Sequence, residues 1–188
     1  MVPIDYIGGR LGNRMFQLAY IFAQHKRGLI PDIWLQYPEY FHEFEREIQE
    51  FYEGGIVSRP QVSIHVRRGD YVTHPAFVDL CKTDYYERAI ALFPDDSFLV
   101  CSDDIAWCKA KWDTNGDHSH RFTFSVGRTE VEDMNLMAGC KSNIIANSSF
   151  SWWSAYLNPN KSKRVVYPLA WHTDNVQRVG FLPSWEGI

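Results

Sequence analysis

From residue 62 onward, short apolar runs alternate with segments of helical periodicity, and this order constrains the fold more than any other feature of the sequence. Strands are expected at 62–65, 98–101, 122–124, 143–146 and 165–167, with helices between them at 83–93, from 103, at 130–139 and at 150–157. Short apolar strands that alternate with helices are typical of a doubly wound parallel sheet. We therefore predict an α/β fold for residues 56–188.

Residues 1–55 are expected to form a smaller, separate lobe. A glycine loop at 8–13 precedes a helical pattern at 15–23, and a second amphipathic pattern at 39–53 ends at Gly54 and Gly55. The apolar side of the 39–53 segment carries Phe41, Phe44, Ile48 and Phe51. Two interpretations of this side stay open. Either it packs on the chain's own sheet, or it contacts a second subunit of a homo-oligomer, because an apolar patch of that size rarely stays exposed to water.

Polar side chains follow four of the predicted strands at the point where each strand ends. They are His65, Arg67, Arg68 and Asp70 after the first strand, Ser102, Asp103 and Asp104 after the second, Ser125 after the third, and Asn147, Ser148 and Ser149 after the fourth. In an open parallel sheet, ligands bind in the crevice outside the carboxyl ends of the strands. The sequence therefore predicts a ligand site at this edge of the sheet.

The segment HVRRGD at 65–70 indicates the chemistry of that site most strongly. Two adjacent arginines at the end of a buried strand cannot both lie in the core, and their guanidinium groups suit phosphate oxygens. Gly69 allows a sharp turn, and Asp70 can hold an arginine in place or accept a hydrogen bond from a sugar hydroxyl. The alternative is a surface ion pair between Arg68 and Asp70. The position of the segment directly after a strand, with His65 beside it, favours phosphate binding.

The segment Asn147-Ser148-Ser149-Phe150 is the second candidate. It lies between an apolar strand and a helix, so its hydroxyl and amide groups fall at a helix amino terminus, which is a position that binds anions. Ser148 or Ser149 is also expected to cap that helix.

Two further groups of residues carry weaker signals. Gly9, Gly12 and Asn13 belong to a glycine loop before a helix, which suits a phosphate, although glycines in turns are common. Asp103 and Asp104 could hold a metal ion, but two adjacent carboxylates more often cap the next helix or bind a ribose.

Composition limits the class of protein. The net charge of -4 over 188 residues argues against general affinity for nucleic acid. Pro3, Asp5 and Gly8 interrupt any apolar run at the start, so we expect no signal peptide and a cytoplasmic enzyme. The four cysteines show neither a CxxC pair nor zinc spacing, and reduced, buried thiols are expected.

Four stretches of the chain resemble, in order, the galactoside α-1,2-fucosyltransferase family, glycosyltransferase family 11. They are GGRLGNRMFQLAYIFA, SIHVRRGDYV, FLVCSDDIAWCK and EDMNLMAGCKSNIIANSSFSWWSAYLN. The match spans most of the chain, and HxRRxD and NSSFSWW recur together at the expected separation. One departure concerns length, since members of the family usually carry roughly a hundred more residues between the glycine loop and the arginine motif, about the size of a small domain.

The resemblance implies a Rossmann-like, GT-B-type donor domain with a reduced N-terminal lobe. It also implies an inverting fucosyltransferase that uses GDP-fucose as donor, a galactoside or other glycan as acceptor, and no metal ion or other cofactor. The alternative is a GDP-sugar-binding protein or pseudoenzyme that has lost its acceptor lobe.

The same resemblance suggests roles for individual residues. Arg67 and Arg68 would stabilise the charge that builds on the β-phosphate, and Asp70 is the candidate base. The residues expected to contact the donor are Gly9, Gly12, Asn13, His65, Ser102, Asp103, Asp104, Asn147, Ser148, Ser149 and Phe150.

Overall fold

The computed structural model describes residues 11–27, 41, 44, 48, 56–113, 119–176 and 178–188. The α-helices and strands in these ranges are α1 (Leu11–Arg27), β1 (Arg59–Val66), α3 (Tyr85–Ala91), β2 (Phe98–Ser102), α4 (Ile105–Trp112), β3 (Phe122–Phe124), α5 (Glu130–Ala138), β4 (Cys140–Ile144), α6 (Ser149–Leu157), β5 (Val165–Tyr167) and β6 (Glu186–Gly187). Short 3-10 helices occupy Gly69–Val72, Leu80–Lys82 and Ser119–Arg121. None of the described helices is long and apolar enough to cross a membrane.

The six strands form one parallel sheet in the order β3-β2-β1-β4-β5-β6. The chain builds outward from β1 to β3, then returns to the other side of β1 and continues through β4 to β6. The order therefore reverses between β1 and β4, which is the switch point where doubly wound sheets form their ligand crevice. The predicted α/β, Rossmann-like fold is confirmed.

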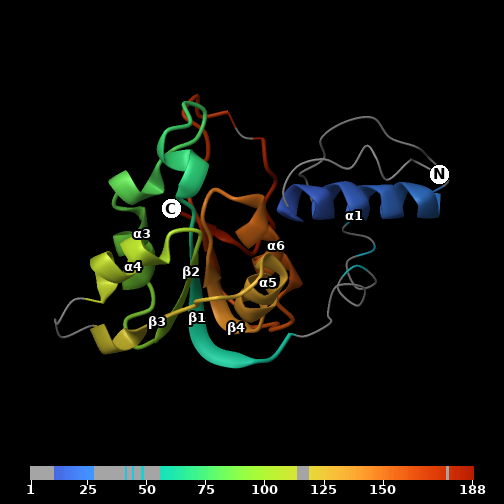
Figure 1. Ribbon diagram of the computed structural model, residues 1–188. Helices are drawn as coiled ribbons and strands as arrows, with labels where there is room; N and C mark the ends of the chain where they lie inside the picture. Colours follow the sequence, from blue (N-terminus) through green and yellow to red (C-terminus); the bar gives the residue numbers. More distant parts are fainter. Residues whose placement is uncertain are drawn as a thin grey trace.

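Helices cover both faces of this sheet, and the alternation of side chains along β1 assigns each residue to a face (Figure 1). Val62, Ile64 and Val66 pack in a cluster with residues of α3 and α4. Ser63 and His65 point to the opposite face, which α5 and α6 cover, because successive strand residues alternate between faces. Both faces of β1 are buried, as expected for a central parallel strand.

Helix α1 packs against α6 on the outside of the α5–α6 layer (Figure 1). Met15, Phe16 and Ala19 join a single core cluster with Trp152 and Trp153, whose side chains are both fully buried. The burial of the tryptophan pair agrees with the expectation that it belongs to the core. The proposed boundary at residues 54–55 lies outside the described residues, so the separation of a 1–55 lobe stays a prediction.

The described part of the 39–53 segment favours one of its two interpretations. Phe41 and Ile48 are buried in the same cluster as α1 and α6, and Phe44 packs against that cluster. Phe41 and Ile48 therefore belong to the chain's own core, and Phe44 lies partly buried at its edge. Phe51 lies outside the described residues, and a homo-oligomer stays a prediction.

The fourth strand differs from its expected position. The apolar run predicted a strand at 143–146, whereas β4 spans Cys140–Ile144 and follows α5 after the single residue Gly139. Gly139 fits there because a Cβ atom would lie 2.1 Å from the backbone oxygen of Val57. An apolar-run criterion misses the start of this strand, because Lys141 is exposed and Ser142 is polar although it is buried.

A buried amide network holds the carboxyl ends of α5 and α6 to the sheet. The Asn143 side chain donates to Ser63 Oγ at 2.7 Å and to the Met137 carbonyl at 2.8 Å. Asn158 in turn donates to Asn143 Oδ1 at 2.8 Å and to the Cys140 carbonyl at 2.7 Å. If one of these hydrogen bonds is lost, the buried polar atom that remains cannot bind water in place of its partner, and this costs stability.

Replacement of Asn143 by Leu, which has the same number of side-chain heavy atoms, is expected to lower the free energy of unfolding by about 3 kcal/mol. It removes the buried hydrogen bonds that the Asn143 side chain makes with the Asn158 amide, the Met137 carbonyl and Ser63 Oγ. Chemical denaturation measures this loss. The control is Asn160→Ala, which removes an exposed hydrogen bond to the Lys141 carbonyl and should cost about 1 kcal/mol. Equal losses for the two variants would contradict this role of the network.

Candidate functional site

A cavity of about 450 Å³ opens at the carboxyl edge of the sheet, at the switch point between β1 and β4. That volume lies within the range of small-molecule sites. Its described lining comes from α1, from the ends of β1 and β2, and from the amino termini of α5 and α6. The lining residues are Gly12, Asn13, His65, Arg67, Asp70, Tyr71, Phe77, Cys101, Ser102, Asp103, Arg128, Glu130, Asp133, Ser148, Ser149 and Phe150. The structure thus brings together most of the residues that the sequence predicted.

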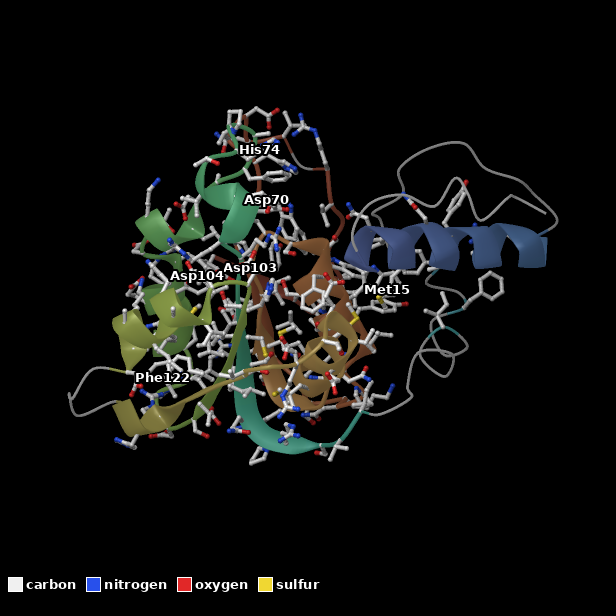
Figure 2. All side chains as sticks on the ribbon, viewed as in Figure 1. Met15, Asp70, His74, Asp103, Asp104 and Phe122 are labelled. Atoms are coloured by element: carbon white, nitrogen blue, oxygen red, sulfur yellow. The ribbon has the colours of Figure 1, made fainter. Side chains whose placement is uncertain are left out.

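Two arginine–aspartate pairs connect the ends of β1 and β2. The strands are parallel and in register, with His65 opposite Cys101 and Val66 opposite Ser102. Continued by two residues, this register places Arg67 beside Asp103 and Arg68 beside Asp104, and both ion pairs form. Because side chains alternate along each strand, the pairs lie on opposite faces of the sheet. Figure 2 shows the two aspartates next to each other at this edge, with Asp70 beyond them.

Arg67 lies on the cavity side and is held from two directions. Its Nη1 lies 2.6 Å from Asp103 Oδ2, and its Nη2 forms an ion pair with Asp70. The guanidinium carbon lies 5.1 Å from the centre of the Tyr71 ring, a cation–π distance. Its side chain is 12% exposed. Arg67 therefore presents a fixed, oriented cation to the cavity.

Arg68 faces away from the cavity, and the ligand contact that the sequence suggests for it stays a prediction. Its Nε donates to Asp104 Oδ2 at 3.0 Å, and its guanidinium lies 4.3 Å from the centre of the Trp107 ring. Burial works against its charge, but hydrogen bonds to Cys81 and Asp104 outweigh burial and raise the pKa of Arg68. Among the described residues, those that line the cavity include Arg67 and not Arg68.

Asp104 is a cap of helix α4 and not a cavity residue. Its side chain accepts a hydrogen bond from the Trp107 amide at 3.1 Å, and its own amide donates to Ser102 Oγ at 2.9 Å. The Trp107 amide, followed by Arg68, lowers the pKa of Asp104. The expectation that one aspartate caps the next helix is thus met by Asp104, and the donor contact predicted for it stays a prediction. Asp103 accepts from the Arg68 amide at 2.8 Å and faces the cavity.

Gly69 makes the turn between the two arginines and Asp70 possible. Its φ is +29°, in the region that favours glycine, and a Cβ atom would lie 2.6 Å from Asp103 Oδ2. A side chain at this position would therefore push Asp103 away from Arg67. The predicted sharp turn at Gly69 is confirmed.

Three helix amino termini meet at the cavity. The first turn of α1 contributes Gly12 and Asn13, α6 contributes Ser148 to Phe150, and α5 contributes Glu130. A Cβ atom on Gly12 would lie 2.5 Å from the Phe150 nitrogen, so only glycine lets α1 approach the start of α6 this closely. Free amide groups and the helix dipoles make such ends favourable for anions. The convergence supports an anion as ligand.

Of the polar residues after β4, Ser148 caps helix α6 as expected, and Asn147 binds backbone carbonyls. Ser148 caps α6 by accepting from the Phe150 amide at 3.4 Å, and Ser149 donates to Asn13 Oδ1 at 2.7 Å. Asn147 is buried, and its amide donates to the carbonyls of Val78 and Trp171. It therefore ties together two backbone segments, and among the described residues it does not line the cavity. The ligand contact suggested for Asn147 stays a prediction.

His65 forms part of the cavity wall as a neutral imidazole. Its side chain is 6% exposed, and its ring centre lies 5.3 Å from that of Phe150. Burial lowers the pKa of His65 to about 4, although the nearby charge of Asp103 opposes this shift. Its Nδ1 is buried and has no hydrogen-bond partner among the described residues. That atom is available to a bound molecule once side chains adjust.

Sequence reasoning missed several residues of the lining. Arg128, Glu130 and Asp133 come from the start of α5, and Tyr71 and Phe77 come from the segment after the arginine loop. Asp133 accepts from Ser125 Oγ at 2.5 Å. Ser125 follows β3, and the sequence analysis expected polar residues at strand ends to lie at the site. The same reasoning, extended to the helix after β3, could have found Asp133.

Three further predictions concern features other than the described lining of the cavity. Gly9 lies outside the described residues, so its predicted donor contact is untested. In the part of the chain that the structure describes, no group of three or more His, Cys, Asp or Glu side chains could hold a metal ion. The four cysteines are free thiols, and three are buried, as predicted.

The sequence matches a model of the family described as Glycosyl transferase family 11 over residues 39–188. It is 38% identical to the O-antigen biosynthesis glycosyltransferase WbnK of Escherichia coli, over 67% of this chain and 44% of that protein. It is 40% identical to an alpha-1,2-colitosyltransferase of Escherichia coli, over 58% and 40% of the two chains. It is 30% identical to the galactoside 2-alpha-L-fucosyltransferase Sec1 of Mus musculus, over 92% and 50%. The chain thus spans about half or less of the length of these relatives.

The buried state of His65 predicts its pH behaviour. With a pKa of about 4 in the folded protein and 6.5 in the unfolded chain, the unfolded state binds the extra proton first as the pH falls. The contribution of His65 to stability should therefore be complete above pH 6.5 and should be lost between about 6.5 and 4. NMR of labelled imidazole carbons should show a neutral His65 down to pH 5, with His65→Asn assigning the signal. A midpoint near 6.5 would contradict the burial.

Proposed function

Because the chain belongs to glycosyl transferase family 11, we propose that it transfers fucose from GDP-fucose to a sugar hydroxyl of a glycan acceptor, with inversion at the anomeric carbon. Galactosides are the acceptor class named for the mouse relative. The donor, the acceptor and the activity of the whole protein are parts of this proposal. The cavity at the switch point is its donor site.

The observation that carries the proposal is the anion-binding character of the cavity. Arg67 enters it from the end of β1, and the amino termini of α1 and α6 meet beside it. A diphosphate needs donors of this kind, because charge-assisted hydrogen bonds from a guanidinium and amides at helix ends both favour phosphate oxygens. These donors are oriented by packing before a ligand arrives, which is how electrostatic stabilisation of a leaving group is achieved.

The α5 end of the cavity, where Asp133 lies, suits a guanine base. Asp133 lines the cavity, and Ser125 fixes one of its carboxylate oxygens. A carboxylate accepts hydrogen bonds only, and guanine presents two adjacent donors, its N1–H and 2-amino groups, whereas uracil presents one. The acidic side chain therefore favours a guanine nucleotide as the carrier of the sugar. His65, which is neutral and close to Phe150, would lie between this end and the diphosphate.

The proposed reaction is a single displacement. An acceptor hydroxyl oxygen forms a bond to the fucose C1 atom from the face opposite the diphosphate, while the bond between C1 and the β-phosphate oxygen breaks. The bonding electrons leave with GDP, and Arg67 stabilises the resulting charge. The hydroxyl proton passes to a carboxylate, for which Asp70 is the candidate, since its side chain lines the cavity and is 48% exposed. When a phosphate competes for Arg67, the Asp70 carboxylate can take up this proton.

Colitose is a second candidate for the transferred sugar. The 40% identity to an alpha-1,2-colitosyltransferase favours it, and colitose is fucose without its 3-hydroxyl group. A third possibility is a GDP-sugar-binding protein without transfer activity. Transfer from labelled GDP-fucose and GDP-colitose to a panel of galactosides distinguishes the two sugars. Slow hydrolysis of the donor without acceptor distinguishes an active site from a simple binding site.

Arg67→Ala is expected to lower transfer from GDP-fucose by roughly 100-fold or more, because it removes the guanidinium that faces the leaving group. Arg68→Ala provides a matched comparison at the neighbouring position. Since Arg68 packs on Trp107 and Asp104, its loss should lower the midpoint of thermal unfolding more, and turnover less, than the loss of Arg67. Radiolabelled transfer and calorimetric melting measure the two effects. Near wild-type turnover of Arg67→Ala, or no transfer and no hydrolysis by the wild type, would refute the proposal.

The proposed reaction needs no metal ion, because the carboxylates nearest the arginines are already occupied. Asp103 binds Arg67 and the Arg68 amide, and Asp104 binds Arg68 and caps α4. Transfer is therefore expected to continue in EDTA at an unchanged rate. A loss of transfer in EDTA that manganese or magnesium restores would show that a divalent cation supplies the charge instead.

A further inference from the structure

We propose that Arg128 is a second phosphate-binding residue of the cavity and supplies the cation that Arg67 alone cannot provide. This inference rests on the proposed function, because it concerns the diphosphate of the same donor. The two arginines would hold the diphosphate from opposite walls, Arg67 from the end of β1 and Arg128 from the loop before α5.

The charges around the cavity show why a second cation is needed. Its described lining contains the carboxylates of Asp70, Asp103, Glu130 and Asp133 and only two guanidinium groups, those of Arg67 and Arg128. Both terminal nitrogens of Arg67 already bind carboxylates, Nη1 with Asp103 and Nη2 with Asp70. A diphosphate that met Arg67 alone would therefore meet a neutralised cation among carboxylates, which repel it.

Arg128 is not neutralised in this way. It is exposed, and no hydrogen bond or ion pair joins it to another residue in the described part of the chain. Two acidic neighbours on α5 are already occupied. Glu132 accepts from the Thr129 amide and hydroxyl in a capping box, and Asp133 accepts from Ser125. The guanidinium of Arg128 thus keeps all its donors for a ligand.

The local backbone directs Arg128 to the cavity. Gly127 has a φ of +72° and nothing within 4 Å of its Cβ position, so the chain turns there in open space before Thr129 caps α5. Arg128 lies between this turn and the cap, and its side chain lines the cavity with Glu130. The capping box fixes the residue that follows Arg128, and Arg128 lines the cavity next to the amino terminus of α5, an end that favours anions.

Titration with guanosine, GMP and GDP tests this role, because only the phosphates should depend on Arg128. Arg128→Gln is expected to weaken GDP binding by roughly 10- to 100-fold, the range of a lost hydrogen bond to a charged group, and to leave guanosine binding unchanged. Arg128→Lys keeps the charge but loses the planar guanidinium group, so its affinity for GDP should lie between those of the wild type and Arg128→Gln. The control is Arg88→Gln, since Arg88 is exposed, pairs with Asp84 and lies on α3 away from the cavity. It should change no affinity.

The possible outcomes separate this inference from the proposed function. If the wild type binds GDP tightly and Arg128→Gln binds it within twofold of the wild type, the inference is wrong and the proposed function stands. Equal losses for guanosine and GDP would also overturn it, since Arg128 would then contact the base. If the wild type binds GDP no better than guanosine, both are wrong. Melting curves of Arg128→Gln should match the wild type, because the side chain has no partner to lose among the described residues.

Discussion

The register between β1 and β2 is the constraint on which the rest of the site depends. It places two adjacent arginines opposite two adjacent aspartates, and strand alternation sends one pair to each face of the sheet. The pair of Arg68 and Asp104 anchors the loop to helix α4 and its cap. The pair of Arg67 and Asp103 remains at the cavity. One arginine is therefore used to hold the turn, and its neighbour is left to face a ligand.

The topology adds the remaining features of the site. Because the strand order reverses between β1 and β4, the helices that follow on either side leave a crevice, and α1 closes it by packing its first turn against α6. Gly12 is the residue that permits this approach. Arg67 is already paired with two carboxylates in the empty site, so phosphate binding exchanges one partner of Arg67 for another. Under this exchange, the Asp70 carboxylate separates from Arg67 only when the donor is bound.

Much of the fold and part of the site could be predicted from the sequence. Apolar runs and helical periodicity were sufficient to predict the parallel sheet. The polar residues that follow the strands were expected at one edge, and the structure places them there: His65, Arg67, Asp103 and Ser149. The opposite orientation of Arg68 could also have been predicted, because neighbouring side chains at the end of a strand point to opposite faces of the sheet. Because the two arginines are adjacent in the sequence, the sequence analysis gave both the same role.

Other features depend on contacts between distant segments. Asn147 looked like a ligand contact because it follows a strand, yet its two partners are carbonyls 69 and 24 residues away along the chain. No local sequence pattern indicates these two carbonyl partners. Arg128 has no motif around it either, and only the folded position of the loop before α5 brings it to the cavity.

The central claim is that the diphosphate of a guanine nucleotide binds between Arg67 and the amino termini of α1 and α6. A crystal structure of the complex with GDP tests it most directly. Phosphate oxygens are expected within hydrogen-bonding distance of the Arg67 guanidinium and of the amides near Gly12 and Ser149, with the base beside Asp133. A diphosphate bound away from Arg67, or a base at the α1 end of the cavity, would contradict the claim.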